Sequence, residues 1–198
     1  MTAVDDRSMT TDVVEFFENL EVPEGYKVEL LRGEIVMMAG PDLVHNDIVD
    51  ALLDHFPRKR WRRLQTQDID LLGETSEPQP DLVVLERGAG PAAGRLLPAQ
   101  VVSLLVEVVS KTSVHRDYVV KRSIYAAGGV PVYLIVDPRG AECLVLTEPS
   151  GSGEAADYRS ERKWKFGETL HLPVLDVDVD TSEFGVYPGA TPPVTRAP

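Results

Sequence analysis

Two apolar stretches decide the fold: PDLVVL at residues 80–85 and VVSLLVEVVS at residues 101–110. Valine and leucine dominate both, and turn residues bound them, which predicts two buried strands. Each carries an acid where a core strand is expected to have none, Asp81 at the start of the first and Glu107 inside the second. Buried carboxylates are costly without partners, and two of them on neighbouring strands repel each other. The pair therefore predicts a divalent metal site.

A helix and a further strand are expected directly after the second stretch. Thr112 or Ser113 is a suitable N-cap for a helix over residues 114–127, and Gly128 and Gly129 are a suitable C-terminal stop. Residues 132–138 then read as a strand. Strand, helix and strand at this spacing indicate a βαβ unit with a parallel pair of strands.

The remaining elements follow from periodicity and turn residues. We expect a helix from residue 11 or 12 to residue 20, a hairpin of residues 26–31 and 34–38, and a helix over 43–56. A hairpin strand over 141–147 and further strands over 64–72, 158–166, 168–172 and 174–179 are also expected. The chain is long enough for one domain, here residues 11–187, between ends at 1–10 and 188–198 that are predicted to be disordered.

The composition narrows the function classes. The formal net charge of −12 opposes non-specific nucleic-acid binding, which needs basic residues to neutralise phosphates. The single cysteine, Cys143, lies in an apolar run and is expected to be a buried, inert thiol. The N-terminal residues lack the apolar core of a signal peptide, and no apolar run is long enough to cross a bilayer. We therefore expect a cytoplasmic protein without a membrane partner.

One basic cluster stands out in this acidic chain. Residues 57–63 hold five basic side chains beside Trp61: Arg58, Lys59, Arg60, Arg62 and Arg63. Two interpretations are equally favoured. The cluster is either a solvated charge run that complements the end of the preceding helix, or a DNA phosphate-contacting patch with an aromatic beside it.

His45 falls on the apolar face of the predicted helix over 43–56, three residues before Ile48. For a lone histidine on such a face, a hydrogen-bonded core side chain is the more common role. The alternative is that His45 faces the acidic site and orients a carboxylate or a phosphate.

The ordered motifs resemble those of the bacterial putative restriction endonuclease family, within the PD-(D/E)XK nuclease superfamily. The resemblance covers residues 12 to 185 and rests on the set and its order, since no single motif is specific. The matching motifs are Gly33-Glu34-Ile35, His45, Pro80-Asp81 with the strand that follows, Glu107 within its valine run, Asp117 with Lys121 and Tyr125, and residues 129–138.

The resemblance implies an α/β (α+β) restriction-endonuclease-like fold: a mixed β-sheet flanked by helices, with additional N- and C-terminal strands. It also implies a Mg²⁺ site, open to Mn²⁺ as a substitute, formed by Asp81, Glu107 and the carbonyl of Val108. Glu34 would be a helper acid from the N-terminal part.

The superfamily lysine normally lies two residues after the second acid, where this chain has Val109. In this family the lysine matches Lys121 on the following helix, supported by Asp117 and Tyr125. Strand parity makes Lys111 a rival for that role. Taken alone, Asp117 and Lys121 are explained by an i,i+4 ion pair on an exposed face.

The set predicts a Mg²⁺-dependent endonuclease that hydrolyses phosphodiester bonds of DNA. By analogy with enzymes that cut both strands of a duplex, we expect a homodimer. Two alternatives stay open: a catalytically inactive, nuclease-like oligomeric binding protein, which the valine at position 109 and the negative charge favour, and a metal-dependent hydrolase of small phosphoesters.

Overall fold

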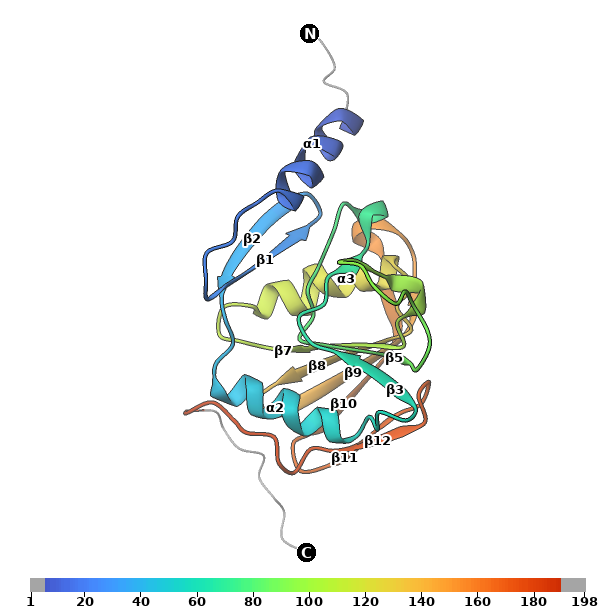
Figure 1. Cartoon of the computed structure of the whole chain (residues 1–198). Helices are drawn as coiled ribbons and strands as arrows, with labels where there is room; N and C mark the ends of the chain where they lie inside the picture. Colours follow the sequence, from blue (N-terminus) through green and yellow to red (C-terminus); the bar gives the residue numbers. More distant parts are fainter. Residues whose placement is uncertain (1–5, 190–198) are drawn as a thin grey trace, which may run out of the picture.

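The computed structural model describes residues 6–189 and has helices on both faces of a central sheet (Figure 1). Its helices are α1 (Asp6–Glu18), α2 (Leu43–Asp54) and α3 (Lys121–Ala127), and its short helical turns are η1 (Leu72–Glu74), η2 (Ala99–Val101), η3 (Arg116–Val120) and η4 (Gly153–Ala155). Its strands are β1 (Tyr26–Leu31), β2 (Glu34–Ala39), β3 (Trp61–Leu64), β4 (Ile69–Asp70), β5 (Leu82–Glu86), β6 (Leu97–Pro98), β7 (Leu104–Val108), β8 (Val132–Asp137), β9 (Glu142–Ser150), β10 (Asp157–Lys165), β11 (Thr169–Leu172) and β12 (Val177–Asp180).

The central sheet has six strands in the order β10-β9-β8-β7-β5-β3. Strands β7 and β8 are parallel, and the chain between them forms η3 and α3, so the predicted βαβ unit is confirmed. The other neighbours are antiparallel, as are the β1-β2 and β11-β12 hairpins outside this sheet. The predicted mixed sheet, flanked by helices and extended by terminal strands, is therefore present.

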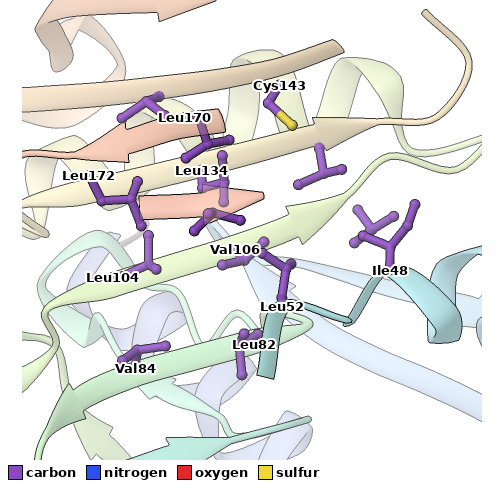
Figure 2. Close-up of a cluster of buried hydrophobic side chains, with 14 of the residues drawn as sticks. Ile48, Leu52, Leu82, Val84, Leu104, Val106, Leu134, Cys143, Leu170 and Leu172 are labelled. Carbon is purple, nitrogen blue, oxygen red and sulfur yellow. The ribbon is translucent and has the colours of Figure 1, made fainter. Parts of the chain in front are cut away.

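Alternating side chains of the central strands build a core on each face of the sheet. On one face, Val84 and Val106 pack with Ile48 and Leu52 of α2 and with Leu170 of β11 (Figure 2). On the other face, Val83 and Leu105 pack with the buried side of α3. Burial on both faces explains why the two deciding stretches read as nearly continuous apolar runs.

The β1-β2 hairpin brings the N-terminal part of the chain to the α3 side of the sheet. Its first strand forms a two-way backbone pairing with Glu77, in which Leu30 N donates to Glu77 O and Glu77 N donates to Leu30 O. Leu30 and Glu29 are fully buried as a result. This attachment places the side chains of β1 beside the start of β5.

Several element boundaries differ from the expectation. Helix α1 begins at Asp6. The predicted strand over 64–72 is divided into β3 and β4, and β3 starts three residues earlier than expected, at the buried Trp61. The helix expected over 114–127 is interrupted by the π-helical turn η3 before α3. Residues 1–5 and 190–198, most of the ends predicted to be disordered, lie outside the described residues. Within residues 6–189, no helix is long and apolar enough to span a membrane.

Candidate active site

The two acids of the deciding stretches lie opposite each other, Asp81 directly before the start of β5 and Glu107 near the end of β7. Leu82 pairs with Val106 in the antiparallel register, so Asp81 comes to lie across from Glu107. The backbone N–H of Asp81 donates to the carbonyl of Val106 at 3.1 Å. Like charges directly across a strand pair destabilise a sheet unless another group offsets them. The sequence prediction that these acids meet at adjacent strand ends is what the geometry shows.

Lys121, the first residue of α3, lies between two buried carboxylates. Its Nζ is 2.8 Å from Glu107 Oε1 and 2.8 Å from Glu29 Oε1, and its side chain is 2% exposed. Burial alone would lower the pKa of Lys121, but the charges of Glu107 and Glu29 outweigh it and raise that pKa above its usual value. The lysine is therefore a fixed positive charge rather than a proton acceptor.

Asp81 is held by three groups from different elements. His45 Nε2 on α2 lies 2.9 Å from Oδ2, the backbone N–H of Val108 donates to the same oxygen at 2.8 Å, and Lys27 Nζ lies 3.5 Å from Oδ1. Burial would raise the pKa of Asp81, but Lys27 and His45 hold it well below its usual range. Because a carboxylate only accepts, Nε2 of His45 carries the shared proton. His45 thus faces the acidic site, the sharper of its two interpretations.

Glu107 is the acid of the pair whose negative charge is disfavoured by its surroundings. Burial raises its pKa above the usual value, against the attraction of Lys121 and with the help of the negative charge of Asp81. Tyr125 donates a hydrogen bond of 2.6 Å to Oε1, the oxygen that also contacts Lys121. A cation placed beside this carboxylate would offset both its burial and its repulsion from Asp81.

The donor set fits a hard divalent cation. Within residues 6–189, Glu107 Oε2 has no partner, and the closest contact of Asp81 Oδ1 is the 3.5 Å one to Lys27, so each carboxylate keeps one oxygen available. No group of three or more His, Cys, Asp or Glu side chains suited to a metal occurs in the described part of the chain. Two carboxylates completed by a backbone carbonyl, water and substrate oxygens are the arrangement that Mg²⁺ accepts and that Zn²⁺ sites avoid.

These groups line one cavity of about 180 Å³. Asp81, Glu107, Val108 and Lys121 line it together with Lys27, and so do the following side chains from the surrounding loops and helices: Asp42, His45, Arg116, Asp117 and Tyr187. The cavity joins residues from β1, β2, α2, β7, η3 and α3 with Asp81, which directly precedes β5, so it forms only in the folded chain.

Asp117 is buried near Lys121 but forms no ion pair with it. Ser113 donates its hydroxyl to Asp117 Oδ2, and burial raises the pKa of Asp117 to about 6 despite the charge of Lys121. The exposed i,i+4 ion pair considered for Asp117 and Lys121 is therefore not what the structure contains. Lys111, the rival lysine, is exposed and lies with its Nζ 5.9 Å from the ring centre of Tyr187.

The structure places Glu34 elsewhere. Glu34 is exposed at the start of β2, opposite Leu31 in the hairpin register, and does not line the cavity. The third acid beside Lys121 is Glu29, whose Oε1 also accepts from the backbone N–H of Gln79 at 2.7 Å. Burial would raise the pKa of Glu29, but Lys121 and Lys27 together lower it.

The basic cluster lies at the far end of β5 from Asp81. Trp61 pairs with Glu86, five residues or about 17 Å along the strand from Asp81. Arg63 donates to the carbonyls of Leu53 and Phe56 at the end of α2, and two neighbours donate to other backbone carbonyls, Arg60 to Leu175 and Arg62 to Pro91. Helix-end complementation thus accounts for Arg63, and the cluster does not border the acidic cavity.

Comparisons with known proteins show the family and the fold of the chain. Residues 14–181 match the Uma2 family, described as "Putative restriction endonuclease", and the chain belongs to that family. A crystal structure from Anabaena variabilis, titled a putative nuclease belonging to DUF820, has a TM-score of 0.59 and 15% sequence identity, and the match covers 83% of this chain and 90% of that one. No curated protein matches the chain. The family and the restriction-endonuclease-like fold expected from the sequence are confirmed.

Proposed function

We propose that this protein is a Mg²⁺-dependent endonuclease that hydrolyses phosphodiester bonds of DNA. The observation that carries the proposal is the facing pair of Asp81 and Glu107 in one cavity with a buried lysine. Membership of a family described as putative restriction endonuclease supports nucleic acid as the substrate.

Asp81, Glu107 and the carbonyl of Val108 are the groups proposed to hold Mg²⁺ or Mn²⁺. A divalent cation bound there supplies Lewis acidity to the phosphoryl oxygens and makes a nearby water more acidic. His45 and the N–H of Val108 fix Asp81 Oδ2, while Tyr125 and Lys121 fix Glu107 Oε1, so the other oxygen of each carboxylate stays available. Such supporting hydrogen bonds orient ligands and tune their basicity.

Lys121 is proposed to supply a fixed positive charge near the phosphate. Two carboxylates hold its ammonium group, and its raised pKa keeps it protonated at neutral pH. A charge that is already oriented before the reaction stabilises the developing negative charge of a phosphoryl group without further reorganisation. We propose Glu29, rather than the Glu34 that the resemblance implies, as the helper acid from the N-terminal part, and infer that it orients this lysine.

The proposal is tested by incubating supercoiled plasmid with the purified protein in Mg²⁺, Mn²⁺ or chelator. We expect metal-dependent nicking that Asp81→Asn and Glu107→Gln abolish and that Glu34→Gln, an exposed acid-to-amide control, retains. Nicking that persists in chelator or in both variants would contradict the assignment.

The same experiment separates the other two functions. Hydrolysis of a chromogenic phosphodiester without plasmid cleavage would favour a small-phosphoester hydrolase. Tight binding of DNA or protein without hydrolysis in any metal would favour a nuclease-like binding protein. We also propose a homodimer, for which light scattering should give twice the chain mass of 21.8 kDa.

A further inference from the structure

Acidic side chains outnumber lysine and arginine side chains among the residues that line the cavity. Three lysine or arginine side chains line it: Lys27, Arg116 and Lys121. Lys121 is held by Glu29 and Glu107, and Lys27 lies 3.6 Å from Glu29 and 3.5 Å from Asp81. Both ammonium groups are therefore already paired with carboxylates, and a basic side chain without such a partner has more hydrogen-bonding capacity left for a phosphate.

Arg116 differs from the two lysines because its guanidinium is not held by a carboxylate of the described residues. Within residues 6–189 it forms no ion pair with a carboxylate, and its Nη2 donates a hydrogen bond of 3.5 Å to the thioether sulfur of Met38. Its Nε is buried and has no hydrogen-bond partner. A thioether is a weak acceptor, so the guanidinium keeps most of its donor capacity.

The backbone explains how Arg116 reaches the cavity. It begins the π-helical turn η3, one residue before the buried Asp117 and five before Lys121. Single π-helical turns are rare and occur often at functional sites, because they re-aim side chains at one turn of a helix. In this segment Asp117 and Lys121 are buried, while Arg116 is half-exposed.

We propose that Arg116 binds a non-bridging oxygen of the phosphodiester that enters the cavity. The proposal rests on the proposed nuclease function and assigns its phosphate-binding residue. The planar guanidinium fork matches the geometry of phosphate oxygens and forms charge-assisted hydrogen bonds with them. Arg116 lines the same cavity as Asp81, Glu107 and Lys121, so a phosphodiester at the acidic pair lies within the cavity that this guanidinium borders.

The test measures DNA binding separately from cleavage. Fluorescence anisotropy of a short fluorescein-labelled DNA duplex, with Ca²⁺ in place of Mg²⁺, gives the dissociation constant at several salt concentrations. The variants are Arg116→Gln, Arg116→Lys and the control Arg159→Gln. Arg159 is exposed on β10, does not line the cavity and has the same charge to lose.

We expect Arg116→Gln to weaken binding about 10- to 100-fold, the range of one charge-assisted hydrogen bond. The slope of log K against log salt should fall by about one unit, the signature of one lost phosphate contact. Arg116→Lys should lose less, and Arg159→Gln should stay close to the unchanged protein. In cleavage assays, Arg116→Gln should raise KM by a similar factor.

Equal affinity and equal salt slope for Arg116→Gln and Arg159→Gln would overturn the assignment of Arg116. That result in a protein that still cleaves plasmid would leave the nuclease proposal standing. Binding by the unchanged protein without cleavage in any metal would overturn the nuclease proposal, while the comparison of variants would still decide the role of Arg116. Absence of both binding and cleavage would overturn both.

Discussion

Replacing Lys121 with methionine should destabilise the protein strongly, although no atom of the hydrophobic core is removed. Methionine fits the buried channel of the lysine stem but leaves Glu29 and Glu107 without the ammonium that lies 2.8 Å from each. Removing one partner of a buried ion pair costs about 3–5 kcal/mol. For a chain of this size, that corresponds to a fall of roughly 6–20 °C in Tm.

Urea denaturation in chelator, followed by circular dichroism, measures this cost without a metal to compensate for the lost charge. The matched control is Lys163→Met, since Lys163 is 56% exposed and lies 3.3 Å from Glu142. An exposed pair of this kind contributes about 0–1 kcal/mol. Adding Glu29→Gln to Lys121→Met should recover part of the loss, because one uncompensated buried charge is removed. The reasoning would be refuted if Lys121→Met and Lys163→Met had the same unfolding free energy.

Three further predictions follow from the site and the core. Glu29→Gln should reduce plasmid cleavage about 10- to 100-fold by releasing Lys121, whereas Glu34→Gln should not, and equal rates for the two would refute the role of Glu29. The pKa of Asp81 is lowered in the folded protein, so its contribution to stability is present above about pH 4 and is lost on acidification. The difference in unfolding free energy between the unchanged protein and Asp81→Asn should therefore narrow as the pH falls below about 4. A difference that widened on acidification would contradict the lowered pKa. Burial raises the pKa of the Cys143 thiol, so a thiol reagent should modify it in denaturant and not in the native protein; rapid native labelling would contradict its burial.

The sequence predicted the central strands because buried strands carry a strong signal. Both deciding stretches are apolar on each face, and the single acid in each marks the position where the two strands meet a common cavity. The placement of Lys121 beside Glu107 came from the resemblance to a family. When the start of a helix is not known, the sequence does not define which of its faces meets a strand. The π-helical turn before α3 also changes the angle between successive side chains, so the helical period alone does not place Lys121.

Glu29 was missed although its signal matches that of Glu107. Both are single acids inside a run of apolar strand residues, here between Val28 and Leu30. The family resemblance gave the role of helper acid to Glu34, next to Gly33, instead. The pairing of Leu30 with Glu77 decides between the two acids, because it buries β1 and leaves the start of β2 exposed. A pairing between segments so distant in sequence has no local pattern that predicts it.

The basic cluster could not be assigned from the sequence for a similar reason. Its spacing fits a phosphate-binding patch and a helix end equally well. Trp61 decides its position, because burial of this ring starts β3 and directs Arg63 back to the carbonyls at the end of α2. Arg58 and Lys59 remain exposed, at the opposite end of β5 from the acidic pair.

The central claim is that Asp81 and Glu107 together hold one divalent cation. Isothermal titration calorimetry with Mn²⁺ tests it most directly, on the unchanged protein and on Asp81→Asn, Glu107→Gln and Glu34→Gln, with circular dichroism to confirm folding. We predict one ion per chain in the unchanged protein and in Glu34→Gln, and no measurable binding in the other two variants. Binding that survives in both Asp81→Asn and Glu107→Gln, or that is absent from the unchanged protein, would contradict the account.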